Sequence, residues 1–466
     1  MARPAGWPVL LLAALPLVAL PLAGGARLGS AMVADAPKGL PIRVLLLEAP
    51  QITIGAAGKQ GLQLRDQSGR TLLVVSPGRQ LRVGRKRDVL TLEPYPEARK
   101  EDNNAAQPPL ALGSPLGVEE VPPGSEPRQV PLQELRFDPI APQSLVVLKQ
   151  RRYRGTLLLR PEGEGLQAVN RLPLETYLAG VVGSEMPGSW PLAALEAQAV
   201  ASRTYALQQL RPKAPFDLKA TVASQVYKGV EAESGPVRQA VASTRGKVLM
   251  HGQQLINAVF HSSSGGLTEN SGDLWSRQLP YLVSVPDFDT SSPVSRWEKA
   301  FAPDALRQAF AEIGGATTIQ PLQASKTGRI QRAKVIGPRG ELVLSGSELR
   351  RRLGLRSTLV QFQFEPAKPQ DMAGAMALPT LPYLPQPTGE PGDAREGPAG
   401  SMSPGGALLP PDPISGAPSF RLVVRGRGYG HGVGMSQWGA YALALRGKSY
   451  EDILRHYYRG AVLRSY

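Results

Sequence analysis

The sequence predicts an α+β fold in which short antiparallel strands and several helices form one main domain with two flexible insertions. Three observations support this prediction. Residues 42–92 are short apolar runs separated by glycine or polar turns, a pattern typical of antiparallel strands. Residues 172–210 carry two successive helical patterns. Two stretches, 96–130 and 367–418, are rich in loop-forming residues, and we expect both to be flexible.

The first residues have the pattern of a secretory signal peptide. Arg3 is followed by an apolar run from Pro8 to Ala23 and then by small residues. This run is short for a membrane-spanning helix, which needs about 20 apolar residues, and prolines interrupt it. We therefore expect residues 1–35 to be a signal peptide or an N-terminal anchor. The protein would then be exported to the periplasm or cell envelope, and would meet the membrane only through this segment.

The amino-acid composition limits the kinds of binding partner and metal site that the protein can have. The chain has 466 residues, a formal net charge of +15 and no cysteine. Disulfides and cysteine-based metal sites are therefore excluded. A strongly basic chain suits an anionic partner, but no nucleic-acid-binding module is recognisable. An anionic cell wall or membrane surface fits an exported protein better than nucleic acid does, and solubility charge with no specific partner is the alternative.

The strand patterns form two groups, and both groups precede the first helical pattern. We expect residues 40–95 to form an N-terminal β unit and residues 96–130 to be a flexible insertion. Strand patterns then resume in the runs SLVVLKQ, YRGTLLLR and GLQAVN, which lead directly into the first helical pattern.

The first helical pattern carries an acidic residue on its apolar side. Positions i, i+3, i+4, i+7 and i+8 are Leu174, Tyr177, Leu178, Val181 and Val182. The i+11 position of the same stripe is Glu185, and Pro187 then ends the helix. Burial raises the pKa of a carboxyl group, as a general acid requires near neutral pH. The alternative is that Glu185, at a helix end, turns out into solvent.

The second helical pattern follows after a Met-Pro-Gly-Ser turn. Ser189 is a candidate N-cap and Pro191 lies in the first turn. If this helix folds back on the first, Arg203 could point at the turn after Glu185 and provide a fixed positive charge there.

The rest of the chain mixes short helices, a hairpin and a low-complexity stretch. We expect helices at 306–313 and 346–353 and a hairpin in the run AKVIGPRGELVL. Residues 367–418 contain 12 prolines and 8 glycines in 52 positions, more than the roughly 25–30% that marks low complexity. We interpret them as an insertion within the domain, because further motifs follow in residues 419–466.

Four blocks, in order, resemble the SpoIID/LytB family of cell-wall proteins. They are LPLETYLAGVVGSEMPGSWPLAALEAQAVASRTYAL, SQVYKG, FHSSSGGLTENSGDLW and GYGHGVGMSQWGA. The resemblance implies that 131–366 and 419–466 are two parts of a SpoIID-like catalytic domain. SpoIID is a lytic transglycosylase that cuts peptidoglycan glycan strands after their stem peptides are removed, whereas LytB is described as an enhancer of a wall amidase.

The family resemblance also assigns roles to residues. The Glu of the SEMP motif is the family's catalytic acid, which is Glu185 here, and a lytic transglycosylase works with one carboxylate. We expect substrate-binding roles for Arg203, Gln225, Tyr227, His261, Tyr429, His431 and Gln437. The sequence departs from the family pattern at Glu196, where relatives often carry Lys. This reversal of charge puts the exact substrate in doubt more than the reaction class.

Two motifs have structural alternatives. In some relatives, a His and a Cys in this region resemble a zinc site. This chain has His261 followed by serines instead, which make a poor zinc site, so we predict no metal and no cofactor. His261 either hydrogen-bonds substrate or is structural. The alternating glycines 426–434 do not have dinucleotide-binding spacing. The family resemblance implies that they line a groove beside the catalytic acid. The alternative is a glycine-rich loop that caps a helix at 436–446.

Three functions follow from these motifs. The leading hypothesis is an exported lytic transglycosylase that acts on glycan strands, with Glu185 as general acid and base. The second is a non-catalytic wall-binding protein that stimulates an N-acetylmuramoyl-L-alanine amidase. The third is a two-carboxylate hydrolase, which would need a second acid such as Glu196, Asp273, Asp287 or Asp289 across the cleft.

Overall fold

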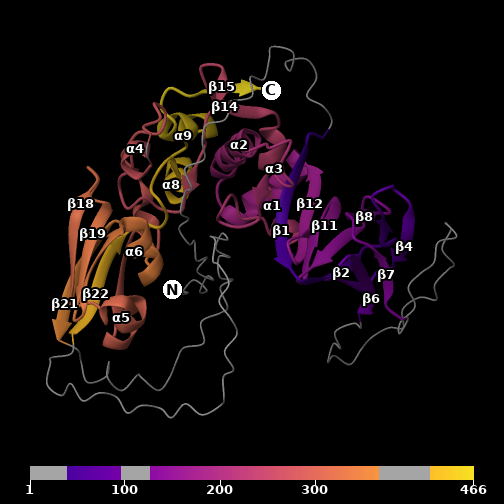
Figure 1. Ribbon diagram of the computed structural model, residues 1–466. Helices are drawn as coiled ribbons and strands as arrows, with labels where there is room; N and C mark the ends of the chain where they lie inside the picture. Colours follow the sequence, from indigo (N-terminus) through magenta and orange to yellow (C-terminus); the bar gives the residue numbers. More distant parts are fainter. Residues whose placement is uncertain (1–38, 96–125, 276, 367–419) are drawn as a thin grey trace, which may run out of the picture.

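The computed structural model describes residues 39–95, 126–275, 277–366 and 420–466 (Figure 1). These segments contain helices and many short, mainly antiparallel strands, which confirms the predicted α+β class. The expected leader at 1–35 and the low-complexity insertion at 367–418 lie outside the described residues. In the part that the structure describes, no helix has the length and apolar character needed to cross a bilayer.

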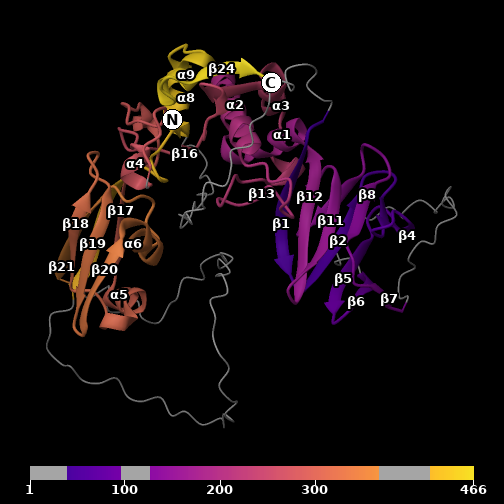
Figure 2. The same ribbon diagram turned by 45° about the horizontal axis from the view of Figure 1, so that its top comes forward.

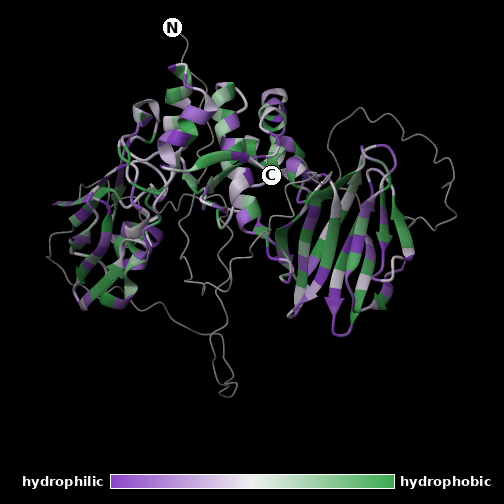
Figure 3. Ribbon diagram, turned by 90° about the horizontal axis from the view of Figure 1, so that it is seen from above, coloured by the Kyte–Doolittle hydropathy of each residue, from purple (hydrophilic) through white to green (hydrophobic). Residues whose placement is uncertain are grey.

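The N-terminal part is built from two sheets that share one hydrophobic core. The first sheet has the strand order β13-β1-β12-β11-β8-β3-β4. Its strands are β1 (Pro41–Ala49), β3 (Leu62–Arg65), β4 (Thr71–Val75), β8 (Leu135–Pro139), β11 (Thr156–Glu162), β12 (Gly165–Pro173) and β13 (Leu218–Lys219). Because alternate residues along a strand face opposite sides, hydrophobic and hydrophilic positions alternate along these strands in Figure 3.

The second sheet has the order β10-β9-β2-β5-β6-β7. Its strands are β2 (Gln51–Ala57), β5 (Gln80–Lys86), β6 (Val89–Tyr95), β7 (Arg128–Pro131), β9 (Leu145–Leu148) and β10 (Arg151–Tyr153). Ile52 and Ile54 from this sheet and Ile42 and Val44 from the first sheet lie in the same core. Strand pairing across the chain therefore joins the expected N-terminal β unit to the strands that precede the first helix.

Two expected boundaries differ from the structure. The predicted insertion at 96–130 is too long at its C-terminal end, because Arg128–Pro131 pairs with β6 as strand β7. Residues 96–125 lie outside the described residues. The predicted boundary at 131 also divides the two-sheet unit, since strands β8 to β12 belong to it. Pairing between distant strands depends on tertiary contacts that local composition does not encode.

A helical body lies next to the two-sheet unit (Figure 1). Its helices are α1 (Leu174–Glu185), α2 (Leu192–Gln208), α3 (Gly235–Ser243), α4 (Ser271–Leu274), α8 (Gln437–Leu445) and α9 (Tyr450–Tyr457), with short 3₁₀ turns η2 (Gly229–Ala232) and η3 (Asp289–Ser291). Its strands are β14 (Lys247–His251), β15 (Gln254–Leu255) and β24 (Val462–Ser465) in one sheet, and β16 (Phe260–His261) and β23 (Met435–Ser436) in another. The core of the helical body is continuous with that of the two sheets.

A third unit has a separate hydrophobic core and lies on the other side of the helical body in Figures 1 and 2. Its sheets contain β17 (Arg296–Phe301), β21 (Val360–Pro366) and β22 (Phe420–Arg427), and β18 (Thr318–Ala324), β19 (Ile330–Gly337) and β20 (Gly340–Ser345). Its helices are α5 (Pro303–Ala309), η4 (Ala311–Ile313) and α6 (Gly346–Leu353). Strand β22 returns the chain to the helical body, which brings the last motif back to the first.

Candidate active site

Helix α1 carries Glu185 at its last position. The apolar stripe from Leu174 to Val182 is buried, as its spacing predicts. Met186 leaves the helical conformation, with φ −131° and ψ 144°, because it precedes Pro187. The side chain of Glu185 is half-buried. A carboxyl group therefore stands where an apolar helix face meets the surface.

Two donors hold the carboxylate of Glu185. The backbone N–H of Val226 donates to one oxygen at 2.8 Å, and the side-chain amide of Gln437 donates to the other at 3.1 Å. These groups come from a loop after α2 and from the first turn of α8. Three of the family-like motifs thus meet at one side chain.

Opposing effects act on the pKa of Glu185. Burial raises the pKa of this carboxyl above its usual value, and this is the largest effect. The hydrogen bonds from Val226 and Gln437 and the charge of Lys228 act in the other direction, because they favour the ionised form. The net pKa remains raised. This carboxyl therefore keeps its proton to a higher pH than an ordinary glutamate does, and the two donors still stabilise its conjugate base. Both properties suit a general acid that later acts as a base.

The loop that supplies Val226 is anchored by its neighbours. Gln225 is buried, accepts from the Tyr177 hydroxyl at 3.2 Å and donates to the Ser202 carbonyl at 3.3 Å. Tyr227 is also buried, and its hydroxyl donates to Asn170 at 3.1 Å. The expected substrate-binding role of Tyr227 is wrong, because its side chain is buried in the core. Gln225 and Tyr227 instead fix the backbone of the residue between them.

Arg203 does not point at Glu185, and the predicted charge at that turn is wrong. Its guanidinium, with 0% side-chain exposure, makes two 2.8 Å contacts to the carboxylate of Glu175 in the first turn of α1. Since α2 runs antiparallel to α1, a residue late in α2 lies opposite the start of α1. Ser189 is also not the N-cap of α2, because Pro191 holds that position.

Among the described residues, Lys228 is the cation that acts on Glu185, and it was not among the predicted site residues. Its charge lowers the pKa of Glu185, and its own pKa is lowered mainly by burial. Its backbone N–H donates to the Ser184 hydroxyl at 3.1 Å, which fixes it beside the helix end. The position of Lys228 within the family-like SQVYKG block was the sequence signal that could have identified it.

Pairing of two short strands positions Gln437. His261 of β16 lies opposite Ser436 of β23, and the Trp438 N–H donates to the Ser262 carbonyl at 3.0 Å. The Ser436 hydroxyl caps α8 by accepting from the Gly439 N–H at 3.2 Å. The FHSSSGG motif therefore holds the start of the helix that reaches Glu185.

His261 and His431 lie together with ring centroids 5.4 Å apart. His261 is 4% exposed, contacts the Val433 carbonyl through Nδ1 at 3.1 Å, and has its pKa lowered to about 3, mainly by burial. His431 is half-buried, accepts from the Val433 N–H at 3.1 Å, and also has a lowered pKa because of burial. Both rings are therefore neutral at pH 7.

Four alternating glycines let this segment pack closely. Gly428, Gly430, Gly432 and Gly434 all have positive φ. A Cβ at Gly430 would crowd His261, and one at Gly432 would crowd the guanidinium of Arg329. Tyr429 is buried and bridges to Ser263 as a short antiparallel pair. The glycines are thus required by packing against protein groups.

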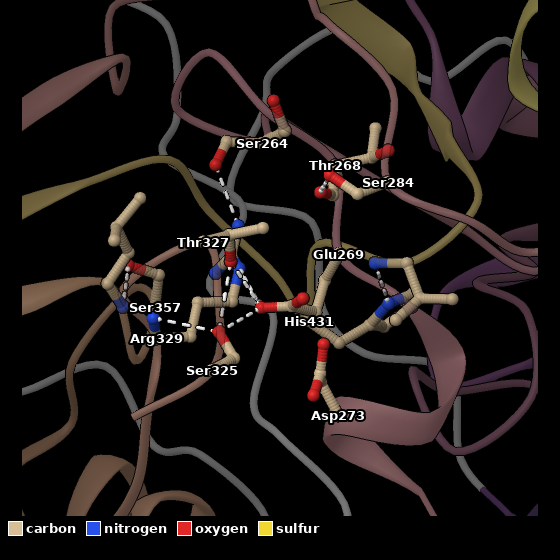
Figure 4. Close-up of polar contacts among 12 residues, drawn as sticks. Ser264, Thr268, Glu269, Asp273, Ser284, Ser325, Thr327, Arg329, Ser357 and His431 are labelled. Carbon is tan, nitrogen blue, oxygen red and sulfur yellow. Dashed lines mark hydrogen bonds and ion pairs between the residues drawn. The ribbon is translucent and has the colours of Figure 1, made fainter. Parts of the chain in front are cut away.

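A buried polar cluster adjoins these glycines (Figure 4). Arg329 lies 3.9 Å from the carboxylate of Glu269 and donates to the Ser264 carbonyl at 2.7 Å. Ser325 and Thr327 also donate to Glu269. Because a buried charge is costly unless it is paired, this cluster ties the third unit to the motif loop.

The other candidate carboxylates are engaged elsewhere. The Ser243 hydroxyl donates to Glu196 at 2.6 Å, and Asn270 donates to Asp273 at 2.9 Å. Asp287 accepts from the Ser264 and Tyr457 hydroxyls, and Asp289 accepts from Ser263. The groups that shift the pKa of Glu185 include no carboxylate. Within the described ranges, no group of three or more His, Asp or Glu side chains is placed to hold a metal ion.

Comparisons with known proteins relate the chain to a family. The family model described as SpoIID, stage II sporulation protein, matches residues 162–251. The stage II sporulation protein D of Bacillus subtilis (strain 168) is 30% identical over 314 residues, which cover 63% of this chain and 75% of that protein. The protein of the same name from Bacillus amyloliquefaciens is 30% identical over 312 residues, with 63% and 74% coverage.

A further relative carries a different name. The amidase enhancer of Bacillus subtilis (strain 168) is 31% identical over 310 residues, which cover 62% of this chain. The chain spans only 40% of that relative's length.

Proposed function

Because the chain belongs to the SpoIID family, we propose that it is an extracytoplasmic lytic transglycosylase that cleaves the glycan strands of peptidoglycan. The main support is the environment of Glu185. Its half-buried carboxyl has a raised pKa and two hydrogen-bond donors, and no carboxylate among the described residues acts on its pKa. A reaction that needs one acid suits this environment better than one that needs two.

In the first step, Glu185 acts as general acid. Its proton passes to the oxygen of the glycosidic bond, the bond between that oxygen and the anomeric carbon breaks, and the leaving sugar departs with a new hydroxyl. Positive charge develops on the anomeric carbon and ring oxygen. Val226 and Gln437 stabilise the carboxylate that forms at Glu185 at the same time.

In the second step, the same carboxylate acts as general base. The 6-hydroxyl of the sugar attacks its own anomeric carbon, and Glu185 takes the hydroxyl proton. The product is a 1,6-anhydro sugar, and the enzyme regains its starting protonation. Because the nucleophile belongs to the substrate, no second carboxylate is needed to activate water, in contrast to ordinary hydrolysis.

The test is the product formed from purified glycan strands stripped of their peptides. We expect 1,6-anhydro ends, detected by mass spectrometry, and a loss of at least about 100-fold in rate for Glu185→Gln. Glu196→Gln is the matched control, because that side chain bonds to Ser243 instead. Products with free reducing ends would indicate hydrolysis and would overturn the proposal.

The second candidate is a non-catalytic enhancer of a wall amidase, favoured by the name of the 31% identical relative. In that case, the protein would bind the wall without using the chemistry of Glu185. An amidase assay with wild-type and Glu185→Gln protein separates the two. Equal stimulation by both proteins, with no glycan cleavage by either, would favour the enhancer.

A further inference from the structure

Three half-buried aromatic side chains lie together near Glu185 and have no role in the steps above. The ring centroid of Trp190 lies 4.9 Å from those of Trp438 and Tyr441, and Trp438 and Tyr441 are 5.5 Å apart. Each side chain keeps part of its surface exposed. We call these three residues the aromatic cluster.

The aromatic cluster adjoins the acid through two chain segments. Trp190 lies in the turn that follows Glu185, and its N–H donates to the Pro187 carbonyl at 3.0 Å. Trp438 directly follows Gln437, which hydrogen-bonds Glu185. Tyr441 is four residues beyond Gln437 in α8 and so lies on the same helix face. The cluster and the acid are therefore linked through the turn after α1 and the first turns of α8.

The indole groups of this cluster differ from that of a structural tryptophan. Trp297 packs its ring against Gly426 and donates its indole N–H to the Gly428 carbonyl at 2.8 Å. Neither Trp190 nor Trp438 donates its indole N–H to a protein acceptor in the segments that the structure describes. Tryptophan N–H groups usually find a partner when they are buried. These two remain available to a ligand.

We propose that the aromatic cluster binds one N-acetylhexosamine ring of the glycan strand, next to the bond at Glu185. This inference rests on the proposed glycan substrate. In a β-linked N-acetylhexosamine of the gluco configuration, the ring substituents are equatorial, so each face of the sugar presents axial C–H groups that pack on an aromatic ring. Its hydroxyl and N-acetyl oxygens can accept from the indole N–H groups. The contact is uncharged and should persist at high salt.

The test measures binding of tetra-N-acetylchitotetraose to the full chain carrying Glu185→Gln. Calorimetry at low and high salt should show that Trp438→Ala raises the Kd about tenfold, because one good aromatic contact is lost. Tyr95→Ala is the matched control, because Tyr95 is 37% exposed on strand β6 of the second sheet. A Kd for Trp438→Ala within about twofold of the parent would overturn the inference.

A second readout covers the case in which the alanine variant does not fold. Replacing Trp190 and Trp438 together by Phe keeps apolar rings in place but removes two fluorophores and both indole N–H groups. The saccharide-induced change in tryptophan emission should then disappear. An undiminished change would locate the sugar elsewhere and overturn the inference. Its failure is distinguishable from that of the proposed function, since an active wild-type protein can still yield anhydro products.

Discussion

The side-chain amide of Gln437 donates a 3.1 Å hydrogen bond to the carboxylate of Glu185, although the two residues are 252 positions apart. Strand pairing between β16 and β23 and the cap of α8 hold Gln437 in place for this contact. The acid and its donor are therefore joined only in the folded protein. Disturbing either element should change the chemistry of Glu185.

Gln437→Leu should move the alkaline limb of the kcat/KM profile to higher pH. Gln437 favours ionised Glu185, so its loss raises a pKa that is already above normal, and activity that needs the protonated acid persists to higher pH. The maximal rate should fall about tenfold or more, because a hydrogen bond to a charged group is lost. A pH–rate profile on peptide-free glycan measures both effects. A limb that moves to lower pH would contradict this role.

Lys228→Met should move the same limb in the same direction without removing a donor to the carboxylate. The Lys228 charge lowers the pKa of Glu185, and a neutral residue would remove that effect. Lys228→Arg should restore the wild-type profile. Lys219→Met provides the comparison, because Lys219 is exposed on strand β13. Equal shifts for Lys219→Met and Lys228→Met would show that only net charge matters.

Gly439→Ala should destabilise the protein and displace Gln437. A Cβ at this position would overlap the carboxylate of Asp287 and the hydroxyl of Tyr457, which hydrogen-bond each other at 2.6 Å in the core. Overpacking of this kind costs about 1–3 kcal/mol. Gly235→Ala is the matched control, because nothing lies near a Cβ there and its φ is not positive. Denaturant unfolding of both variants measures the difference.

Periodicity was sufficient to predict α1 and its buried apolar stripe. It left open whether Glu185, at the end of the helix, faces inward or into solvent, and only the resemblance of the SEMP motif favoured the inward position. Helix α6, at Gly346–Leu353, was likewise predictable from local signals. The role of Arg203 was not. Which residue a helix presents to its neighbour depends on packing direction, and the antiparallel arrangement of α1 and α2 places Arg203 against Glu175.

The motifs also could not distinguish residues that face substrate from residues that hold the backbone. Gln225 and Tyr227 belong to a family-like block, yet both are buried and serve the residue between them, Val226, whose backbone N–H contacts Glu185. A sequence pattern records side chains, whereas the donor here is a backbone group that has no residue signature.

Arg203→Met should reduce stability much more than it alters the pH profile. Removing one partner of a buried ion pair costs about 3–5 kcal/mol, because the other charge stays partly buried without compensation. In a double-mutant cycle, Glu175→Gln should recover part of this loss. The exposed pair Arg455–Asp452 provides a contrast, since such pairs contribute about 0–1 kcal/mol. A shifted pH–rate profile with unchanged stability would instead support a direct role in the site.

His261 should make the native state sensitive to acid. Its pKa is lowered from 6.5 to about 3 by burial, so between these values the unfolded chain binds a proton that the folded chain excludes. Unfolding free energy should therefore fall as pH falls through this window, by about 1.4 kcal/mol per pH unit for this one group. His261→Gln should remove this contribution to the pH dependence of the unfolding free energy. Urea titrations at several pH values between roughly 4 and 6 measure it, because in this range His261 binds a proton in the unfolded chain but not in the folded chain. His251→Gln should leave it intact, because His251 is exposed on β14. An unchanged slope in His261→Gln would mean that this imidazole is protonated in the folded protein.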